Sequence, residues 1–349
     1  MPVEPPQPVV VTGANGFIAQ HCVASLLSHG YRVIGTVRTP AKAAAVAATH
    51  NSHPKLSIVV IEDITDPKAY VAQLQHLSPS AILHLASPFT YDTGDFERDL
   101  MIPAMMGSLA VLAAAQEMPS VRRVVQTNSF ACVYDASLGP APGRTYSARD
   151  WSPLTYEDGV RAADAPTAYR ASKTAAEKAA WDWVKRQKPN FDLVGLCPVM
   201  VFGAFLPGGG PASISGLNTS NRIVHGVVSA GESSPVPPTR APVWVDVQDV
   251  ALAHVRALST PEAGGRRFLL AAGVYCNQEI ADVAREVAAA GKLSSSRIPV
   301  GEPGRREAHL HFGVDVREAE EVLGMDSWRR LGESLGELLP QLTELELQN

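Results

Sequence analysis

The stretch VVVTGANGFIA (Val9–Ala19) decides the fold of this chain. A β-branched apolar run leads into a turn with glycines at 13 and 16 and an alanine at 19, and helical sequence follows. In such a strand–turn–helix unit the glycines let the backbone approach a pyrophosphate, whose charge the helix N-terminus stabilises. A glycine triplet alone is weak evidence, but the flanking strand and helix supply the context that the motif requires. We therefore predict a dinucleotide-binding turn whose contacts come from Gly13, Asn15, Gly16, Phe17 and Ile18.

Strands and helices continue to alternate over the first two thirds of the chain. Apolar runs predict strands near 32–37, 56–63, 81–87, 122–129 and 193–203, with helical patterns between them, including a long helix from about Arg98 to Gln116. Such alternation is typical of a parallel sheet covered on both faces. The predicted fold is α/β, a doubly wound parallel sheet of Rossmann type at residues 8–203. Residues 204–349 are expected to form mainly a small mixed C-terminal substrate lobe, with about 240–258 returning to the Rossmann domain.

Composition and charge narrow the class of protein. Hydrophobic residues make up 46% and charged residues 19% of 349 residues, and the net charge of -5 gives no basic footprint for nucleic acid or an anionic membrane. The N-terminus lacks a secretory pattern, and by this reading no stretch approaches the roughly 20 apolar residues that span a bilayer. We expect a cytoplasmic monomer or homodimer without nucleic-acid or membrane partners. The four scattered cysteines predict reduced core thiols, and the histidines show no metal-binding spacing, so no metal is expected.

The end of the second predicted strand indicates which dinucleotide binds. NAD-specific sites usually carry an acidic residue about 20 positions after the glycine turn. Here GTVRTPAK stands instead, with Arg38 at the strand end and Lys42 one helical turn later. Two cations can neutralise a 2′-phosphate, which favours NADPH (NADP+), although a solvated basic turn is the alternative. Asp63 and Ile64, after the third strand, are predicted beside the adenine, unless Asp63 caps the next helix instead.

Later strands place further residues at the same edge of the sheet. In open α/β sheets, ligands bind outside the carboxyl ends of the strands. The fourth strand ends in HLASPF and the fifth in QTNSF. We therefore expect Ala86, Ser87, Pro88 and Thr127 to line the crevice near the cofactor, with Ser129 over the same crevice.

TAYRASKTAAEK (Thr167–Lys178) predicts a helix that carries Tyr169 and Lys173 four positions apart. This spacing stacks a phenol and an ammonium on one helical face. Alone, the pattern fits an amphipathic surface helix equally well. However, the helix lies between the strand that ends at Ser129 and the strand that ends in CPVMVFG, so three chemical groups converge. A phenol has a pKa of about 10, and a nearby lysine cation stabilises the phenolate and lowers that pKa.

Six segments in their order along the chain resemble the extended short-chain dehydrogenases/reductases: TGANGFIAQH, LHLASPF, RVVQTNSFACVYD, YRASKTAAEKAAW, CPVMVFG and VDVQDVALAH. More narrowly, they resemble fungal methylglyoxal, aldehyde and ketone (carbonyl) reductases, which are related to dihydroflavonol and cinnamoyl-CoA reductases. The resemblance implies NADPH-dependent reduction of a small-molecule carbonyl to an alcohol. Tyr169 would be the general acid, Lys173 its electrostatic partner and a ribose ligand, and Ser129 a hydrogen-bond donor to the substrate oxygen. Pro198 and Val199 match the segment beside the nicotinamide.

The substrate side is predicted from position alone. The residues expected there are Phe89, Thr90, Phe130, Met200 and Phe205, with the segment around Asn218. Their apolar character favours a hydrophobic or aromatic carbonyl compound, although large apolar side chains are as commonly buried for packing. Two positions depart from the family pattern: Met106 replaces an asparagine in the long fourth helix, and Asn128 replaces a serine before Ser129. If the family asparagine organises a relay water near the lysine, the relay here differs or is absent.

Three alternatives share much of this pattern. A nucleotide-sugar epimerase or dehydratase keeps the Tyr/Lys pair but holds NAD, which Arg38 disfavours. A steroid-type alcohol dehydrogenase differs only in its ligand. A non-catalytic NADP(H)-binding regulator would be expected to lose the tyrosine or the lysine.

Overall fold

The computed structural model describes residues 1–87, 93–291 and 297–347. Its strands are β1 (Pro8–Thr12), β2 (Arg32–Val37), β3 (Leu56–Val60), β4 (Ala81–His84), β5 (Arg123–Thr127), β6 (Thr145–Ser147), β7 (Asp192–Pro198), β8 (Met200–Phe202), β9 (Val243–Asp246), β10 (Arg267–Leu270), β11 (Gly273–Val274) and β12 (Gly313–Asp315). Its α-helices are α1 (Phe17–Ser28), α2 (Pro40–Thr49), α3 (Pro67–Leu74), α4 (Ile102–Glu117), α5 (Tyr156–Val160), α6 (Ala165–Gln187), α7 (Thr219–Val228), α8 (Val247–Ser259), α9 (Asn277–Ala289), α10 (Arg317–Leu323) and α11 (Leu331–Leu347).

A parallel sheet organises the N-terminal two thirds of the molecule. Within the described residues its seven strands follow the order β10-β7-β5-β4-β1-β2-β3, and every neighbouring pair is parallel. The strand order reverses between β1 and β4, so their carboxyl ends leave a crevice at that point. The predicted doubly wound α/β fold is confirmed.

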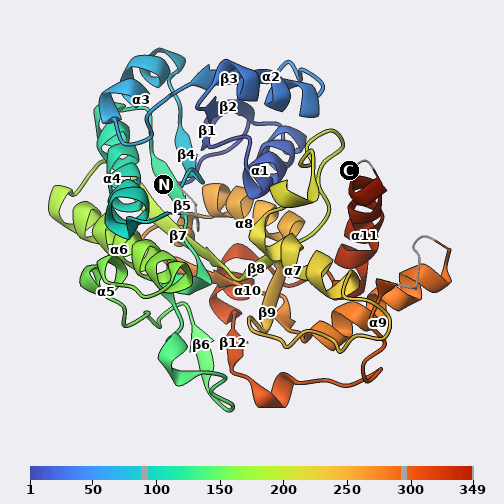
Figure 1. The fold of residues 1–349 in the computed structure, drawn as a ribbon. Helices are drawn as coiled ribbons and strands as arrows, with labels where there is room; N and C mark the ends of the chain where they lie inside the picture. Colours follow the sequence, from blue (N-terminus) through green and yellow to red (C-terminus); the bar gives the residue numbers. More distant parts are fainter. Residues whose placement is uncertain (88–92, 292–296, 348–349) are drawn as a thin grey trace.

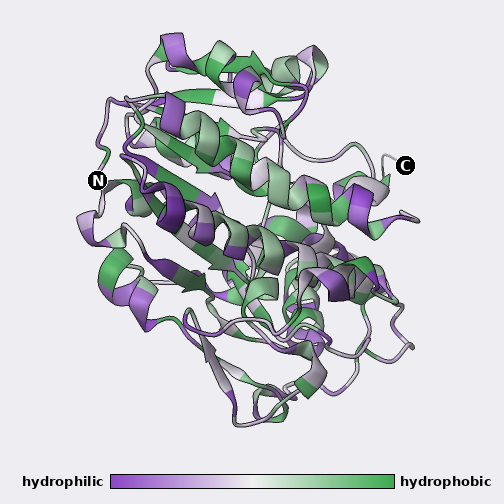
Figure 2. Ribbon diagram, turned by 90° about the vertical axis from the view of Figure 1, so that its left-hand side faces the viewer, coloured by the Kyte–Doolittle hydropathy of each residue, from purple (hydrophilic) through white to green (hydrophobic). Residues whose placement is uncertain are grey.

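Alternating side chains give this sheet two cores. Val9 and Val11 point into one core, with residues of α1 and α8, whereas Val10 points into the other, with residues of α3, α4 and α6. Figure 1 shows these two groups of helices on opposite sides of the strands, and in Figure 2 hydrophobic residues run along the central strands. Near-continuous apolar strands are needed because both faces of the sheet are covered.

The predicted long helix follows a turn of π-helix (Glu97–Met101) and continues as α4. Contrary to the expectation from the sequence, the segment Glu97–Glu117 is long and apolar enough, by length and composition alone, to cross a membrane. In the structure α4 packs between α3 and α6 on the sheet, and Val111, Leu112 and Ala115 lie in the core. Its apolar composition is thus explained by burial within the fold.

A third, smaller core lies in the part of the chain after residue 200. Phe202, Trp244 and Tyr275 pack together beside residues of α7, α9 and α11. A three-stranded sheet in the order β11-β9-β8 supports this core, and β12 pairs with β6 from the N-terminal part. The chain therefore crosses between the two parts several times.

Two strands differ from the expected boundaries. The single strand predicted over 193–203 is two strands: β7 ends at Pro198, whose nitrogen cannot donate to a ladder, and β8 joins the small sheet. Conversely, β10 was expected within the substrate lobe but pairs with β7 at the edge of the large sheet. Local hydrophobic patterns identify a strand but not the sheet to which it belongs.

Two buried histidines connect neighbouring elements of the fold as neutral groups. His254 on α8 contacts Thr127 Oγ1 through Nε2 (2.7 Å) and the Val250 carbonyl through Nδ1 (2.7 Å). His84 Nδ1 lies 2.9 Å from Thr12 Oγ1. Burial lowers the pKa of His254 to about 4 and that of His84 to about 3. Among the described residues no His, Cys, Asp or Glu side chains group in a way that could hold a metal ion.

We predict that the free energy of unfolding of His254→Gln falls less steeply than that of wild type as the pH is lowered. The pKa of His254 is lower in the folded state than in the unfolded state. The contribution of neutral His254 to the free energy of unfolding is therefore present above pH 6.5 and is lost as the pH falls toward 4. The stability gap between wild type and His254→Gln should shrink by roughly 3 kcal/mol over that window. Urea denaturation at a series of pH values measures it, with the exposed His29→Gln as control. Parallel curves for wild type and His254→Gln would contradict this assignment.

Candidate active site

A cavity of about 1180 Å³ opens at the carboxyl ends of the large sheet. Gly13, Leu85, Thr127 and Pro198 bring the ends of β1, β4, β5 and β7 into its wall. Thirteen of the residues predicted from the sequence line it: Gly13, Gly16, Phe17, Ile18, Thr127, Ser129, Phe130, Tyr169, Lys173, Pro198, Val199, Met200 and Asn218. Parallel pairing explains this convergence, because it places all carboxyl ends at one edge.

The turn between β1 and α1 leaves no room for side chains. Gly13 has a φ of +65°, and a Cβ atom there would lie 3.0 Å from the Cα of Ala86. Thr12 Oγ1 fixes the approach of the two segments by accepting hydrogen bonds from the amides of Leu85 (3.0 Å) and Ala86 (2.9 Å). No side chain caps the first turn of α1, and no acidic residue lies in it. Its free N–H groups therefore fit a dinucleotide pyrophosphate.

Helix α6 carries the predicted acid and its partner. Asp164 caps the helix by accepting a hydrogen bond from the Thr167 amide (2.7 Å), and a proline lies in the first turn. One and two turns later, Tyr169 and Lys173 both line the cavity, and Lys173 Nζ lies 5.9 Å from the centre of the Tyr169 ring. Burial lowers the pKa of Lys173, and Glu177 opposes this shift. The predicted pairing on one helical face is present.

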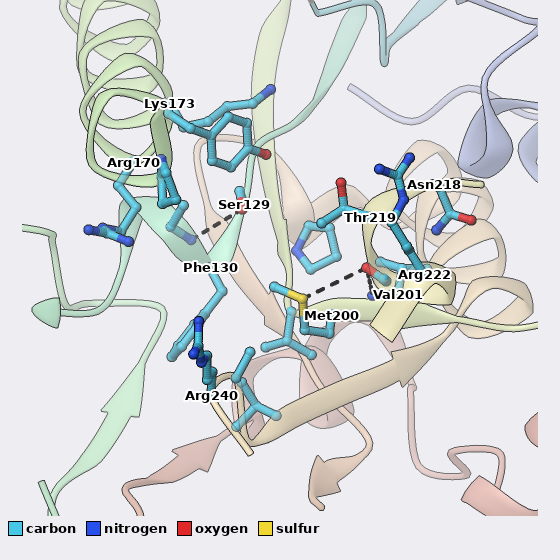
Figure 3. Close-up of a pocket in the computed structure, with 18 of the residues that line it drawn as sticks. Ser129, Phe130, Arg170, Lys173, Met200, Val201, Asn218, Thr219, Arg222 and Arg240 are labelled. Atoms are coloured by element: carbon cyan, nitrogen blue, oxygen red, sulfur yellow. Dashed lines mark hydrogen bonds between the residues drawn. The ribbon is translucent and has the colours of Figure 1, made fainter. Parts of the chain in front are cut away.

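Ser129 lies two residues after the end of β5 and caps a short 3₁₀ helix (Phe130–Cys132). Its Oγ accepts a hydrogen bond from the Ala131 amide (3.1 Å), as Figure 3 shows. In the part of the chain that the structure describes, no residue accepts the hydroxyl proton of Ser129. The hydroxyl of Ser129 can therefore donate a hydrogen bond to a ligand in the cavity.

A second, small void of about 10 Å³ lies behind Lys173. Ala86, Ser87, Ser108 and Gln126 contribute to its wall, and its size and polar lining suit about one water molecule. Met106, which replaces the family asparagine, does not line this void and is 41% exposed. The space for a water beside the lysine is therefore built by other residues.

The residues predicted at the adenine end lie outside the cavity wall. Arg38 is exposed after β2, and no ion pair within the described residues engages it; Lys42 lies in the first turn of α2. Asp63 Oδ1 accepts hydrogen bonds from both the amide (2.8 Å) and the hydroxyl (2.7 Å) of Thr65, which lower its pKa. Asp66, not Asp63, caps α3, so the alternative that Asp63 is the helix cap is wrong.

Several further predicted residues are placed differently. Ile64 lies near Gly107 on α4, and the carbonyl of Asn15 receives a hydrogen bond from Gln20. Phe205 packs edge-on against Phe17 (ring centres 5.2 Å apart) and does not line the cavity. Pro88, Phe89 and Thr90 lie outside the described residues.

The sequence missed most of the substrate side of the cavity. Phe130 stacks on Tyr134 (4.9 Å between ring centres), and Phe312 packs against both rings. Arg170 and Arg240 also line the cavity. Arg170 directly follows Tyr169 within a motif already recognised, so its place in the sequence could have predicted that it lies near the cavity. No local pattern could have placed Phe312 or Arg240, because distant segments bring them there.

A buried ion pair fixes the elements around the site. Arg267 on β10 binds Glu177 on α6 through Nε–Oε1 (2.8 Å) and Nη2–Oε2 (2.9 Å). The same guanidinium donates to the carbonyls of Ala148 (2.8 Å), Asp150 (2.6 Å) and Cys132 (3.2 Å). It thereby connects the tyrosine helix, the segment after Ser129 and the edge strand. Because Arg267 occupies both oxygens of Glu177, the ammonium of Lys173 one turn earlier stays available to other partners.

Comparisons with known proteins agree with this architecture. The model of the NAD dependent epimerase/dehydratase family matches residues 9–271. The chain is 34% identical to the NADPH-dependent methylglyoxal reductase of Saccharomyces cerevisiae over 346 residues, which cover 97% of this chain and 98% of the relative. It is also 34% identical to the ketoreductase azaE of Aspergillus niger, over 96% and 97% of the two chains. The crystal structure of yeast methylglyoxal/isovaleraldehyde reductase complexed with NADPH superimposes with a TM-score of 0.88 at 33% identity, over 98% of this chain and 100% of that one.

We predict that Arg267→Met lowers the free energy of unfolding by about 3–5 kcal/mol, because it leaves Glu177 charged and buried without a partner. It should also lower kcat, since Glu177 is then free to attract Lys173. The double variant Glu177→Leu/Arg267→Met should recover most of the stability. Urea denaturation and steady-state kinetics measure both effects. Arg330→Met, which removes an exposed pair with Glu333, is the control and should leave the free energy of unfolding nearly unchanged. A comparable loss in the control would show that burial is not the cause.

Proposed function

The chain belongs to the NAD dependent epimerase/dehydratase family, the extended short-chain dehydrogenases/reductases, and from this we propose that it is an NADPH-dependent carbonyl reductase. The observation that carries the proposal is the convergence of Ser129, Tyr169 and Lys173 in one cavity with the glycine turn. The reaction converts an aldehyde or ketone to an alcohol. The relatives that support it are reductases by name, and they align with nearly the whole chain.

NADPH is the proposed cofactor, and the residues present fit it. Gly13 has no side chain, so its backbone can lie close to Ala86 and to the pyrophosphate, whereas a Cβ atom there would collide with Ala86. The uncapped first turn of α1 offers N–H groups to the same pyrophosphate. Arg38 and Lys42 follow β2, where a 2′-phosphate would need cations and where NAD-specific sites carry an acid. Asn218 lines the cavity with a buried Oδ1 that lacks a partner within the described residues, and a ligand donor can satisfy it. When bound, NADPH supplies the hydride.

The chain's own residues supply the proton and the polarisation. Tyr169 donates a proton to the carbonyl oxygen, and Lys173 stabilises the phenolate that remains. Ser129 donates a hydrogen bond from its hydroxyl to the same oxygen and stabilises the developing charge. Lys173 also holds the nicotinamide ribose, beside Pro198 and Val199. The helical spacing of Tyr169 and Lys173 fixes the geometry of this step before substrate arrives.

The proposed substrate is a small molecule with an apolar or aromatic body. Phe130, Tyr134 and Phe312 form an aromatic wall of the cavity, and Met200 lies nearby. Aromatic rings are recognised by offset or edge-on packing against such a wall. The epimerases and dehydratases of the same family that hold NAD are disfavoured, because Arg38 stands where NAD-specific sites carry an acid.

Two other functions remain to be tested against this proposal. An alcohol dehydrogenase of steroid type would use the same residues in the oxidative direction. A regulator that only binds NADP(H) would turn over no carbonyl. NADPH oxidation with a panel of aldehydes and ketones discriminates between them, because tight NADPH binding without any turnover would favour the regulator. A cytoplasmic location and a monomeric or homodimeric state remain predictions, the latter testable by light scattering.

The decisive test of the chemistry is Tyr169→Phe. Removing the phenolic proton should lower kcat by about 10²- to 10⁴-fold, the usual contribution of a general acid. NADPH affinity, measured by fluorescence titration, should stay within threefold of wild type. Tyr156→Phe removes a phenol that instead bonds Glu97 on the surface, and it serves as the control. Activity of Tyr169→Phe within tenfold of wild type would mean that another group is the acid.

Cofactor choice is tested by Arg38→Glu. The substitution should weaken NADPH by at least about tenfold, since a charge-assisted contact becomes repulsive. NADH, which lacks the 2′-phosphate, should lose much less affinity. Arg32→Glu reverses an exposed charge at the opposite end of β2 and controls for net charge. Equal losses for both dinucleotides would show that Arg38 does not contact the 2′-phosphate.

A further inference from the structure

The charged side chains that line the cavity within the described residues are all cationic. Arg170, Lys173, Arg222 and Arg240 line it, and within the described residues no aspartate or glutamate does. The whole chain, by contrast, carries a net charge of -5. A wall with cations only favours anionic ligands, and the low dielectric of a cavity strengthens that preference.

Two of these cations are already accounted for. Arg222 donates through Nη2 to the carbonyls of Ser215 (3.0 Å) and Leu217 (2.9 Å), so it braces the loop before α7. Lys173 is assigned to the phenolate and the ribose by the proposed function. Arg170 and Arg240 have no such assignment.

Arg170 has unused hydrogen-bonding capacity at the cavity. Its Nη2 donates to Thr167 Oγ1 (2.8 Å), whereas its Nε is buried and has no partner within the described residues. A buried N–H of a charged group without an acceptor is unfavourable, and an oxyanion removes that cost. The planar guanidinium is suited to carboxylate and phosphate groups.

Arg240 lies on a segment held in place by neighbours. Asn277 donates through Nδ2 to the carbonyls of Pro237 (3.0 Å) and Pro238 (3.3 Å), and its amide donates to Thr239 Oγ1 (2.9 Å). Arg240 itself is exposed and makes no hydrogen bond or ion pair with the rest of the described chain. Its guanidinium is thus carried on a fixed backbone at the cavity wall.

Both arginines lie on the substrate side. In Figure 3, Arg170, Phe130 and Arg240 occupy one side of Ser129, and Asn218 and Arg222 occupy the other. The glycine turn, which fits the cofactor phosphates, belongs to the N-terminal elements, and Figure 3 draws these elements (blue) on the side of Asn218, away from Arg170. The phosphates of the cofactor therefore do not explain these two cations.

We propose that the preferred substrates carry an oxyanion, a carboxylate or a phosphate, on the apolar or aromatic body that bears the reducible carbonyl, and that Arg170 and Arg240 bind it. The aromatic wall holds the body between the carbonyl at Ser129 and Tyr169 and the oxyanion at the arginines. This inference rests on the proposed reductase function and specifies its substrate class.

The test compares three para-substituted acetophenones: 4-acetylbenzoate, 4-acetylphenyl phosphate and the neutral methyl 4-acetylbenzoate. The measured quantity is the ratio of kcat/KM for each anion to kcat/KM for the ester. The compounds differ in intrinsic reactivity, but this difference is the same for every variant, so a change in the ratio between variants reports the binding of the anion. Arg170→Gln should lower the ratio by about tenfold or more, the value of a charge-assisted hydrogen bond, and the exposed Arg240→Gln by two- to fivefold. The anion with the larger loss identifies the oxyanion.

Arg161→Gln provides the matched control, since Arg161 is an exposed arginine just before α6 whose one ion pair within the described residues is with Glu157. It should leave the ratio unchanged. If Arg170→Gln fails to fold, Arg240→Gln and the salt dependence of wild type decide: raising NaCl from 0.05 to 0.3 M should lower kcat/KM for the anions but not for the ester.

The outcomes separate the two proposals. If the ester is reduced and the ratio changes less than twofold in the folded arginine variants for both anions, the oxyanion site is wrong and the reductase function stands. If wild type reduces none of the three compounds and no other carbonyl in the panel, the reductase function fails and the substrate class fails with it.

Discussion

The buried pair of Arg267 and Glu177 is the interaction on which the site depends. Two charges with side chains 8% and 1% exposed are stable there only because every strong donor of the guanidinium finds an acceptor. These acceptors come from α6 and from the segments after Ser129 and β6. The tyrosine helix and the serine loop are thus held against the edge strand by one residue. Replacement of either partner alone leaves a buried charge, which is why the geometry resists change.

This arrangement also explains how Lys173 can stay charged in a buried place without forming an ion pair with Glu177 on the same helix. Lys173 must remain cationic in a place where burial lowers its pKa, and the carboxylate of Glu177 lies one turn away on the same face. A lysine–glutamate pair would satisfy both charges but would remove the ammonium from the cavity. Because Arg267 engages both oxygens of Glu177, the carboxylate still favours the charged form of Lys173 by its field without binding the ammonium.

The cavity combines an aromatic wall with unpaired cations, and the two features come from different parts of the chain. Phe130 and Arg170 follow directly after Ser129 and Tyr169, the proposed catalytic residues, so the Rossmann part supplies them. Arg240 and Phe312 come from the C-terminal part, which β12 and β6 fasten to the N-terminal part by parallel pairing. The chemistry is therefore built on the conserved geometry of strand ends, whereas the shape and charge of the substrate side depend on the docking of the second part.

The sequence by itself determined the fold class, the glycine turn and the positions of Ser129, Tyr169 and Lys173, because each depends on local periodicity or on spacing within one element. Tertiary structure decided that the run ending in CPVMVFG splits between two sheets, that β10 closes the edge of the large sheet, and that Phe205 packs on Phe17 and not in the cavity. It also placed Arg267 against Glu177 and Arg240 at the cavity wall. The physical reason is that partners far apart in the sequence meet only when the sheet and the C-terminal part have packed, and no local pattern encodes that meeting.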